Sequence, residues 1–517
     1  MKLRAGLVAI AILVLISTFG ISEYVEYGKR LDTLGWDACA PFAWLTVHAA
    51  ENPGIAYDIN GYNKGENTIY LFLPCRADIS EIVYYTRDTY GNYIERVVDD
   101  FSQGNVLRDG ITIIPMQSKL PTLYMQIDTE QSPYTINEVD EDSTKEKYCY
   151  GDIRLDVTDE MAAQNGWAVS ALSREGDNDS AATVRIKGRG NSSMYLKRSY
   201  SIKLEKRMNL LSMGDSKKWA LVPNTQDPSL MKNIVCFSLA EDAGLDYTPQ
   251  VQPVDVFRNG VYHGTYLLST KIEVSKNRIG IGADDYLANL YDPGTIQKME
   301  FTSKYTSYSP HEDSIYAELV YPENALAEIP KAQEIWQEIL NRIEDESSDA
   351  YLEDIDLESF VKYYWIQELS TNKDCWGRSA YSYYDSSEQK LYMGPIWDMD
   401  ISFGNPEDKR FEWFARTRSW YQTLFQHQSF QEAATDMYFQ GGGMRELFYA
   451  TSDSLDELYE QLKISGQMDC IRWNDEQDRK IHVAYHAESY EEYAQMFIDY
   501  YRERLDWIDE QMLMERY

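Results

Sequence analysis

The chain lacks the motifs of several common enzyme classes. It has no Gly-x-Ser-x-Gly elbow, no His-Glu-x-x-His pair and no Walker loop, and six histidines are present among its 517 residues. Serine hydrolases and zinc peptidases depend on the first two arrangements. The sequence therefore weakens both of these functional classes.

Cysteine is scarce and widely spaced. The six cysteines include no Cys-x-x-Cys pair, which excludes a zinc ribbon and a thioredoxin-like motif. Up to three disulfides could form in an oxidising compartment. Cys236 lies in the apolar run 234–239, so we expect a buried free thiol at this position.

Positive charge is also in short supply. Acidic residues outnumber basic ones by 84 to 49, the formal net charge is -35, and no long basic tract compensates it. Such a surface would repel a polyanionic backbone. The composition therefore excludes nucleic acid as an expected partner and indicates a soluble, repelling surface.

The N-terminus departs from this polar character. Lys2 and Arg4 precede residues 5–21, which are almost entirely apolar. Positive charge before an apolar run is typical of exported proteins, and the length of this run is at the lower limit for spanning a bilayer. We expect residues 1–23 to be an uncleaved signal-anchor, with a cleaved signal peptide as the alternative. Either segment predicts an extracytoplasmic protein, which is membrane-anchored through residues 5–21 or secreted.

The remaining sequence predicts two further parts joined by a linker. Residues 24–137 contain short β-prone runs broken by Gly, Asn and Asp, which predicts a small all-β domain. The polar stretch 138–150 is the predicted linker. In residues 151–517, strands come first and helical patterns follow, which predicts an α+β domain. The expected helices cover residues 230–243, 325–344, 357–370, 454–464 and 489–512.

Two carboxylates lie inside the otherwise apolar, strand-like run 393–405. Asp398 and Asp400 are two positions apart, so in a strand they would share one face at roughly 7 Å. Two anions in apolar surroundings repel each other and lose solvation. A hard cation such as Mg²⁺ or Mn²⁺ relieves both costs and usually accompanies a phosphate substrate. The pair therefore indicates phosphoryl chemistry.

A glycine-rich stretch follows a predicted strand near residue 185. It reads Lys187-Gly188-Arg189-Gly190-Asn191-Ser192-Ser193, and glycines allow backbone N–H groups to approach phosphate oxygens. Arg185, Lys187 and Arg189 would add positive charge. The pattern indicates a phosphate-binding loop, although an ordinary hairpin turn explains Gly-x-Gly as well.

The next predicted strand presents two cations on one face. Alternation places Lys197, Ser199, Ser201 and Lys203 together. A lysine in the middle of a core strand can hold nucleotide phosphates, and Lys203 is the more interesting candidate. The solvated face of an edge strand is the alternative.

One further acid follows a predicted helix. Asp374 comes shortly after residues 357–370 and before a predicted hairpin that leads to Asp398 and Asp400. An acid in this place can serve as a general base toward a hydroxyl group. A turn-forming or capping Asp is the alternative.

Taken in order, these segments resemble the CotH kinase family over residues 152–517. Six segments carry the resemblance, and they are Arg185–Ser193, Lys197–Lys203, Asn224–Asn233, Val256–Leu268, Glu368–Asp374 and Gly394–Asn405. It implies an atypical, secreted or coat-associated protein kinase that binds ATP with Mg²⁺ or Mn²⁺. The expected fold is a reduced kinase-like α+β domain, preceded by the small all-β domain and the membrane segment.

The resemblance also implies roles for single residues. The glycines of the loop would cover phosphate, a lysine would pair with it, one Asp would be catalytic and two would hold the metal. In this chain the corresponding residues are Gly188 and Gly190, Lys203 or Lys197, Asp374, and Asp398 with Asp400.

Two positions depart from the family pattern. Thr270 stands where many relatives have an acidic lysine partner, so Glu273 would have to substitute for it. Ser379 stands where some relatives have a metal-binding Asn, and a hydroxyl is a weaker metal ligand. Two functions therefore remain open: an extracytoplasmic kinase acting on Ser or Thr of a protein, and a non-catalytic surface, spore-coat or envelope scaffold. Glycan binding by the N-terminal domain is compatible with both.

Overall fold

The computed structural model describes most of the chain after its N-terminal region. The described residues are 44–48, 56–59, 62–63, 68–80, 82–87, 93–108, 110–167, 182–190, 196–291, 298–302, 314–375, 379–404, 407–473 and 486–516. The predicted membrane segment 5–21 and Asn191 lie outside them. Among the helices within these ranges, none has the length and apolarity needed to cross a bilayer.

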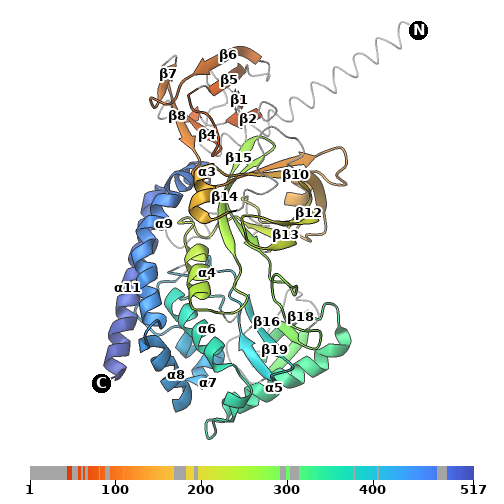
Figure 1. The fold of residues 1–517 in the computed structure, drawn as a ribbon, viewed down its shortest axis with the longest axis vertical. Coiled ribbons are helices and arrows are strands. Elements are labelled where there is room, and N and C mark those ends of the chain that lie inside the picture. Colours follow the sequence, from red (N-terminus) through yellow and green to blue (C-terminus); the bar gives the residue numbers. More distant parts are fainter. Residues whose placement is uncertain are drawn as a thin grey trace, which may run out of the picture.

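Seven strands close into a barrel in the middle of the molecule (Figure 1). Their order around the barrel is β13-β12-β11-β10-β9-β14-β15, and β13 pairs with β15 to close the ring. All neighbours are antiparallel except β9 and β14. The strands are β9 (Thr122–Asp128), β10 (Tyr148–Asp156), β11 (Ala182–Gly188), β12 (Tyr200–Asn209), β13 (Asp215–Val222), β14 (Val251–Arg258) and β15 (Val261–Thr270).

Alternation along the strands separates an apolar interior from a basic outer face. Side chains that pack inside the barrel on three neighbouring strands are Val184, Ile186, Ile202, Leu204, Trp219 and Leu221. Successive strand residues point to opposite faces. Arg185, Lys187, Lys203 and Lys218 therefore lie on the outside, where Arg185 is opposite Lys203 and Lys203 is opposite Lys218.

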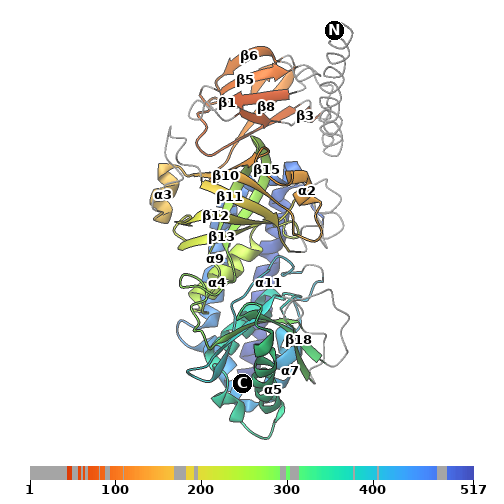
Figure 2. The ribbon, with the colours of Figure 1, turned by 90° about the vertical axis from the view of Figure 1, so that its right-hand side faces the viewer.

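Further strands precede the barrel in sequence and lie above it in Figure 2. The barrel sheet continues from β15 through β2 (Ala56–Ile59), β1 (Trp44–His48), β5 (Ile82–Arg87) and β6 (Tyr93–Asp99). A second sheet contains β3 (Tyr62–Asn63), β4 (Thr68–Leu73), β8 (Ile111–Gln117) and β7 (Val106–Arg108). The predicted domain boundary at residue 137 differs from this arrangement, because β9 belongs to the barrel. The predicted linker contains part of helix α2 (Ile136–Asp140) and the start of β10.

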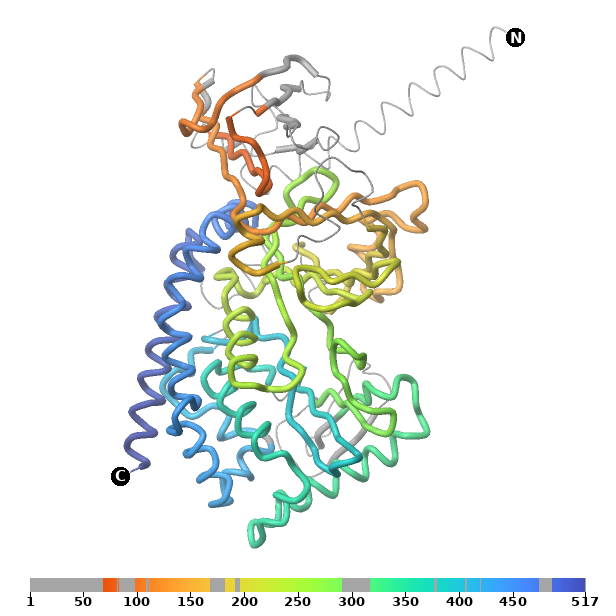
Figure 3. Tube along the Cα trace, in the orientation of Figure 1, coloured from red at the N-terminus to blue at the C-terminus, as the bar shows by residue number. Residues whose placement is uncertain are grey.

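The third region combines helices with a five-stranded sheet, so the predicted α+β class is confirmed. The sheet order is β17-β18-β16-β19-β20, formed by Lys298–Thr302, Ser314–Tyr321, Tyr286–Tyr291, Ala380–Asp385 and Lys390–Met393. The main helices are α4 (Lys232–Asp242), α5 (Ile329–Glu344), α6 (Leu357–Ser370), α7 (Ser419–Leu424), α8 (Gln428–Phe439), α9 (Met444–Trp473) and α11 (Tyr490–Arg516). A short helix α3 (Asp159–Asn165) follows β10. Helices α9 and α11 lie side by side, and α9 also contacts β15 of the barrel (Figure 3). All five expected helices are found.

The prediction of a strand across residues 393–405 was wrong. Strand β20 ends at Met393, and residues 394–404 form a loop. Asp398 has a φ of 63°, in the left-handed region that no strand residue occupies. Side-chain alternation therefore does not bring Asp398 and Asp400 together.

The described cysteines carry no disulfide. Cys75, Cys149, Cys236, Cys375 and Cys470 are all free and buried. The expectation for Cys236 is thus confirmed, and burial raises the pKa of its thiol.

A buried ion pair joins helix α6 to the C-terminal helix α11. Glu368 on α6 and Arg504 on α11 have fully buried side chains, with 2.5 Å between Oε1 and Nη2. The Glu368 carboxylate also accepts hydrogen bonds from the backbone N–H groups of Phe414 and Arg416 at 2.6 and 2.9 Å. Arg504 donates to the carbonyls of Glu368 and Glu412. Both charges are therefore compensated inside the core.

Removing one member of this pair should destabilise the fold strongly. Arg504→Met leaves the Glu368 carboxylate buried without its cation, and losing one partner of a buried pair costs about 3–5 kcal/mol. We expect a large drop in the urea unfolding midpoint. Lys463→Met, which removes a partly exposed cation paired with Glu460, is the control and should change the midpoint far less, because surface ion pairs contribute about 0–1 kcal/mol. Equal midpoints for Arg504→Met and the wild type would contradict this account of the core.

Candidate functional site

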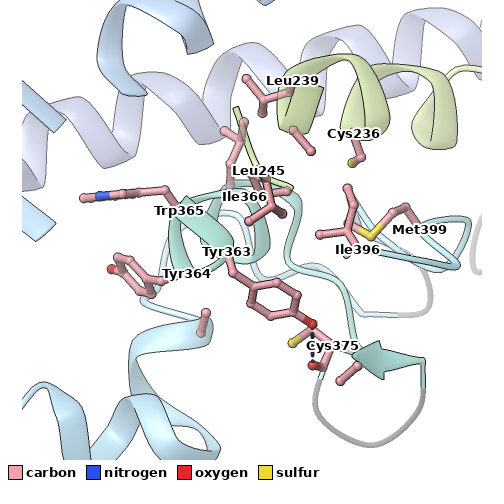
Figure 4. Packing of buried hydrophobic residues seen from close by; sticks show 14 of the residues in the cluster. Cys236, Leu239, Leu245, Tyr363, Tyr364, Trp365, Ile366, Cys375, Ile396 and Met399 are labelled. Atoms are coloured by element: carbon pink, nitrogen blue, oxygen red, sulfur yellow. Dashed lines mark hydrogen bonds between the residues drawn. The ribbon is translucent and has the colours of Figure 1, made fainter. Parts of the chain in front are cut away.

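The turn after α6 places Asp374. Helix α6 ends at Ser370, and Thr371 has a φ of 49°, which turns the chain away from the helix axis. The Asn372 side chain accepts a hydrogen bond from the Asp374 N–H at 3.1 Å. The hydroxyl of Tyr363 donates to the Cys375 carbonyl at 3.1 Å, a bond that Figure 4 shows. The turn is thus held on both sides of Asp374, whose side chain is half-buried.

The loop 394–404 is held between α4 and α6. The Met399 N–H donates to the Asn233 side chain of α4 at 2.9 Å, and the Phe403 N–H donates to the Ser370 carbonyl of α6 at 2.7 Å. Ile396 and Met399 lie in the apolar cluster with α4 and α6 residues (Figure 4). These contacts fix the loop backbone, whereas Asp398 and Asp400 remain half-buried.

Three predicted carboxylates come together at this loop. Burial, followed by the charges of Asp398, Asp227 and Asp374, raises the pKa of Asp400 well above its usual value. Ser379 also belongs to the group, since its hydroxyl donates to Asp398 Oδ2 at 3.3 Å. The arrangement concentrates negative charge in a partly desolvated place, where a cation would be favourable.

Lys232 is a residue of this site to which the sequence alone gave no role. Its side chain is fully buried, and its ammonium donates to the carbonyls of Ser402 at 2.7 Å and Asp400 at 3.4 Å. Burial lowers the pKa of Lys232, and the charges of Asp227 and Asp400 oppose this shift. Lys232 therefore holds the loop 394–404 through hydrogen bonds to two of its backbone carbonyls. The available signal was a lysine two residues before the largely apolar run 234–240, within the segment Asn224–Asn233.

Arg189 connects the glycine loop with the carboxylates. Its guanidinium carbon lies 5.2 Å from the ring centre of Trp397, next to Asp398. Burial lowers the pKa of Arg189, and the charge of Asp398 opposes this shift. Gly190 has a φ of 62°, which glycine adopts without strain. The structure thus brings the end of β11 to the loop 394–404.

Lys203 and Arg185 lie elsewhere on the outer face of the barrel. Lys203 is exposed. Together with Arg185 it lines a cavity of about 530 Å³, whose wall also contains Asp128, Asp152 and Lys217. Neither Asp398 nor Asp400 lines this cavity.

Lys197 is engaged in a buried ion pair. Its ammonium lies 2.5 Å from Asp469 Oδ1 on α9 and 2.7 Å from the Thr265 carbonyl on β15. Both side chains are 2% exposed. The ammonium therefore joins the barrel to α9.

The structure shows the partners of Thr270 and of Glu273, the residue proposed to replace the missing acid. Thr270 is buried, and its hydroxyl accepts a hydrogen bond from the Gln250 N–H at 3.0 Å. Glu273 pairs with Lys218 at 2.8 Å. The lysine partner of Glu273 is thus Lys218 of β13, which the sequence had not singled out.

The carboxylates fit one kind of metal site. Within the described ranges, no three His, Cys, Asp or Glu side chains are placed closely enough to form a complete metal cage. Mg²⁺ does not need one, because it usually takes one or two carboxylates and completes its shell with water and substrate phosphates. Asp398 and Asp400 match this donor set.

Comparison with known proteins gives one result. A family model described as CotH kinase protein matches residues 184–508, from β11 to the middle of α11. The match covers more than half of the chain. No curated protein matches the sequence.

Asp400→Asn should abolish a metal-dependent stabilisation. In the wild-type chain, millimolar Mg²⁺ or Mn²⁺ should raise the thermal unfolding midpoint, since a ligand at 100 times its Kd stabilises by about 2.7 kcal/mol. The variant should gain nothing from metal, yet its metal-free midpoint should be higher because one repelling charge is gone. Asp436→Asn, at an exposed position of α8, should behave like the wild type. A metal response that persists in Asp400→Asn would rule out this site.

Proposed function

Since this chain belongs to the CotH kinase protein family, we propose that it transfers phosphate from ATP to Ser or Thr hydroxyls of a protein. The observation that carries the proposal is the group formed by Asp374, Asp398 and Asp400, with Arg189 of the glycine loop beside it. Phosphoryl transfer needs a base near the acceptor and a positive environment for phosphate, with carboxylates for a metal. These parts come from segments far apart in the sequence.

Asp374 would accept the proton of the substrate hydroxyl. In the proposed step, the hydroxyl oxygen forms a bond to the γ-phosphorus of ATP. The bond between that phosphorus and the bridging oxygen breaks, ADP leaves with the electron pair, and the proton passes to Asp374. A side chain that is half-buried and fixed by its turn suits this role, because general bases act from a defined position.

Asp398 and Asp400 would hold Mg²⁺ or Mn²⁺, which supplies charge neutralisation for the phosphate oxygens when bound. The loop 394–404 would keep both carboxylates in place through its bonds to Asn233 and Lys232. The Ser379 hydroxyl would orient Asp398 through the bond to its Oδ2. A hydroxyl is a weak metal ligand but a good hydrogen-bond donor, so this role suits Ser379 better than direct metal binding.

The N-terminal sequence supports a location for the proposed reaction. Residues 5–21 form the apolar run after Lys2 and Arg4, and they support an extracytoplasmic location with a membrane anchor. The protein acceptor would approach a strongly acidic molecule. Nucleic acid is not part of the proposal.

Phosphate transfer tests the role of Asp374 directly. The full-length chain should label itself or a degenerate Ser/Thr peptide library with γ-labelled ATP and Mn²⁺. Asp374→Asn should lower the initial rate by about 10²–10⁴-fold, the usual contribution of a general base. Asp436→Asn should retain the full rate. Equal labelling by the wild type and Asp374→Asn would favour the non-catalytic scaffold instead.

A further inference from the structure

Lys271 lies next to the basic face of the barrel. It directly follows β15, where Thr270 is opposite Trp219, so the register continues with Lys271 opposite Lys218. Its ammonium lies 3.5 Å from Ser201 Oγ on β12. Thr270 and Lys271 point to opposite faces of the sheet, because strand side chains alternate. A carboxylate at position 270 would point away from Lys271, so the presence of Thr270 does not deprive Lys271 of an ion-pair partner.

Within the described residues, neither Lys271 nor Lys203 has an ion-pair partner, but Lys271 is half-buried whereas Lys203 is exposed. Lys218 pairs with Glu273 at 2.8 Å, and Lys187 pairs with Glu146 at 3.6 Å. No carboxylate from the described part of the chain lies within 4.0 Å of the Lys271 ammonium, which is half-buried. A partly desolvated cation among other cations is unfavourable unless an anion compensates it.

The position of Arg189 indicates where such an anion would lie. Arg189 is an electrostatic neighbour of Lys271 and also of Asp398. The cavity of about 350 Å³ that Lys271 also borders is not the anion's place, because its wall contains Glu241 and Asp246 and neither Asp398 nor Asp400. Lys203 is exposed and lines the other cavity. The Arg189 N–H donates to the carbonyl of Ser199, just before β12, at 3.1 Å, two residues before the Ser201 that Lys271 contacts. Because the Arg189 guanidinium lies beside Trp397, an anion held by Arg189 and Lys271 would lie on the side of Asp398 and Asp400.

We propose that Lys271, and not Lys203, is the lysine that contacts the phosphates of the nucleotide, with Arg189 beside it. The inference rests on the proposed function, since it names the phosphate-binding residue of the same site. We expect a polyphosphate ligand. Lys271 and Arg189 are two separate cations, and a single carboxylate would pair with only one of them.

The surroundings of Lys271 also make this contact sensitive to pH. Burial, then the charges of Arg189 and Lys218, lower the pKa of Lys271 to about 8; Lys187 acts in the same direction, and Glu273 opposes them. In the free protein the amine is charged below this pH and neutral above it. A phosphate favours the charged form, so binding takes up a proton above about pH 8. Nucleotide affinity should therefore fall with rising pH, by up to tenfold per pH unit.

The test is a calorimetric titration of the full-length chain with ATP and Mn²⁺ at pH 7.5 and pH 9. Lys271→Met should weaken binding about tenfold or more at pH 7.5, the usual effect of losing a hydrogen bond to a charged group. Lys203→Met should stay within about twofold of the wild type, because its ammonium is solvated. Wild-type affinity should fall between the two pH values. Lys271→Arg should show a smaller fall, since a guanidinium keeps its charge.

The outcomes separate the two proposals. If the wild type binds no ATP, the proposed function fails and this inference fails with it. If the wild type binds ATP and Lys271→Met binds it equally well, with the same pH dependence, only the role of Lys271 is refuted. The thermal midpoint of ligand-free Lys271→Met should equal or exceed that of the wild type, because methionine removes an uncompensated charge. Lys271→Arg provides a second variant that keeps the charge.

Discussion

The fixed position of the loop 394–404 is the constraint on which the candidate site depends. Asp398 and Asp400 repel each other and their neighbours, so the loop would move apart if its backbone were free. Hydrogen bonds to Asn233 and Ser370, the ammonium of Lys232 and the buried side chains of Ile396 and Met399 prevent this. Helix α6 is itself held by the Glu368–Arg504 pair. Core stability thus maintains an unfavourable concentration of charge, as is common at functional sites.

The barrel supplies the opposite half of the site, and it needs residues that precede the family match. Strands β9 and β10 begin at Thr122 and Tyr148, whereas the match begins at residue 184. Without β9, the edges of β10 and β14 would be unpaired. The basic face of β11, β12 and β13 would then lose the closed ring that orients it. Residues outside the recognisable family region therefore contribute to the geometry of the site.

Sequence reasoning found the acidic half of the site more readily than the basic half. Helix periodicity located α6 and hence Asp374, and an Asp pair in an apolar run is conspicuous whatever its backbone does. The strand prediction at 393–405 failed because apolar, β-prone residues are buried in this loop by tertiary packing. Lys271 was missed for another reason. Its place beside Arg189 depends on the pairing of β13 with β15 and on the packing of the barrel against the helical region. The spacing of residues along the sequence predicts neither of these long-range contacts.

The central claim is that Asp398 and Asp400 hold a metal ion against the phosphates of ATP. A crystal structure of the full-length chain with Mn²⁺ and a non-hydrolysable ATP analogue tests this directly, because manganese is located by its anomalous scattering. We predict a manganese peak about 2.1 Å from oxygens of Asp398 or Asp400 and of the terminal phosphate. A nucleotide bound elsewhere, or a manganese peak away from both carboxylates, would contradict the account.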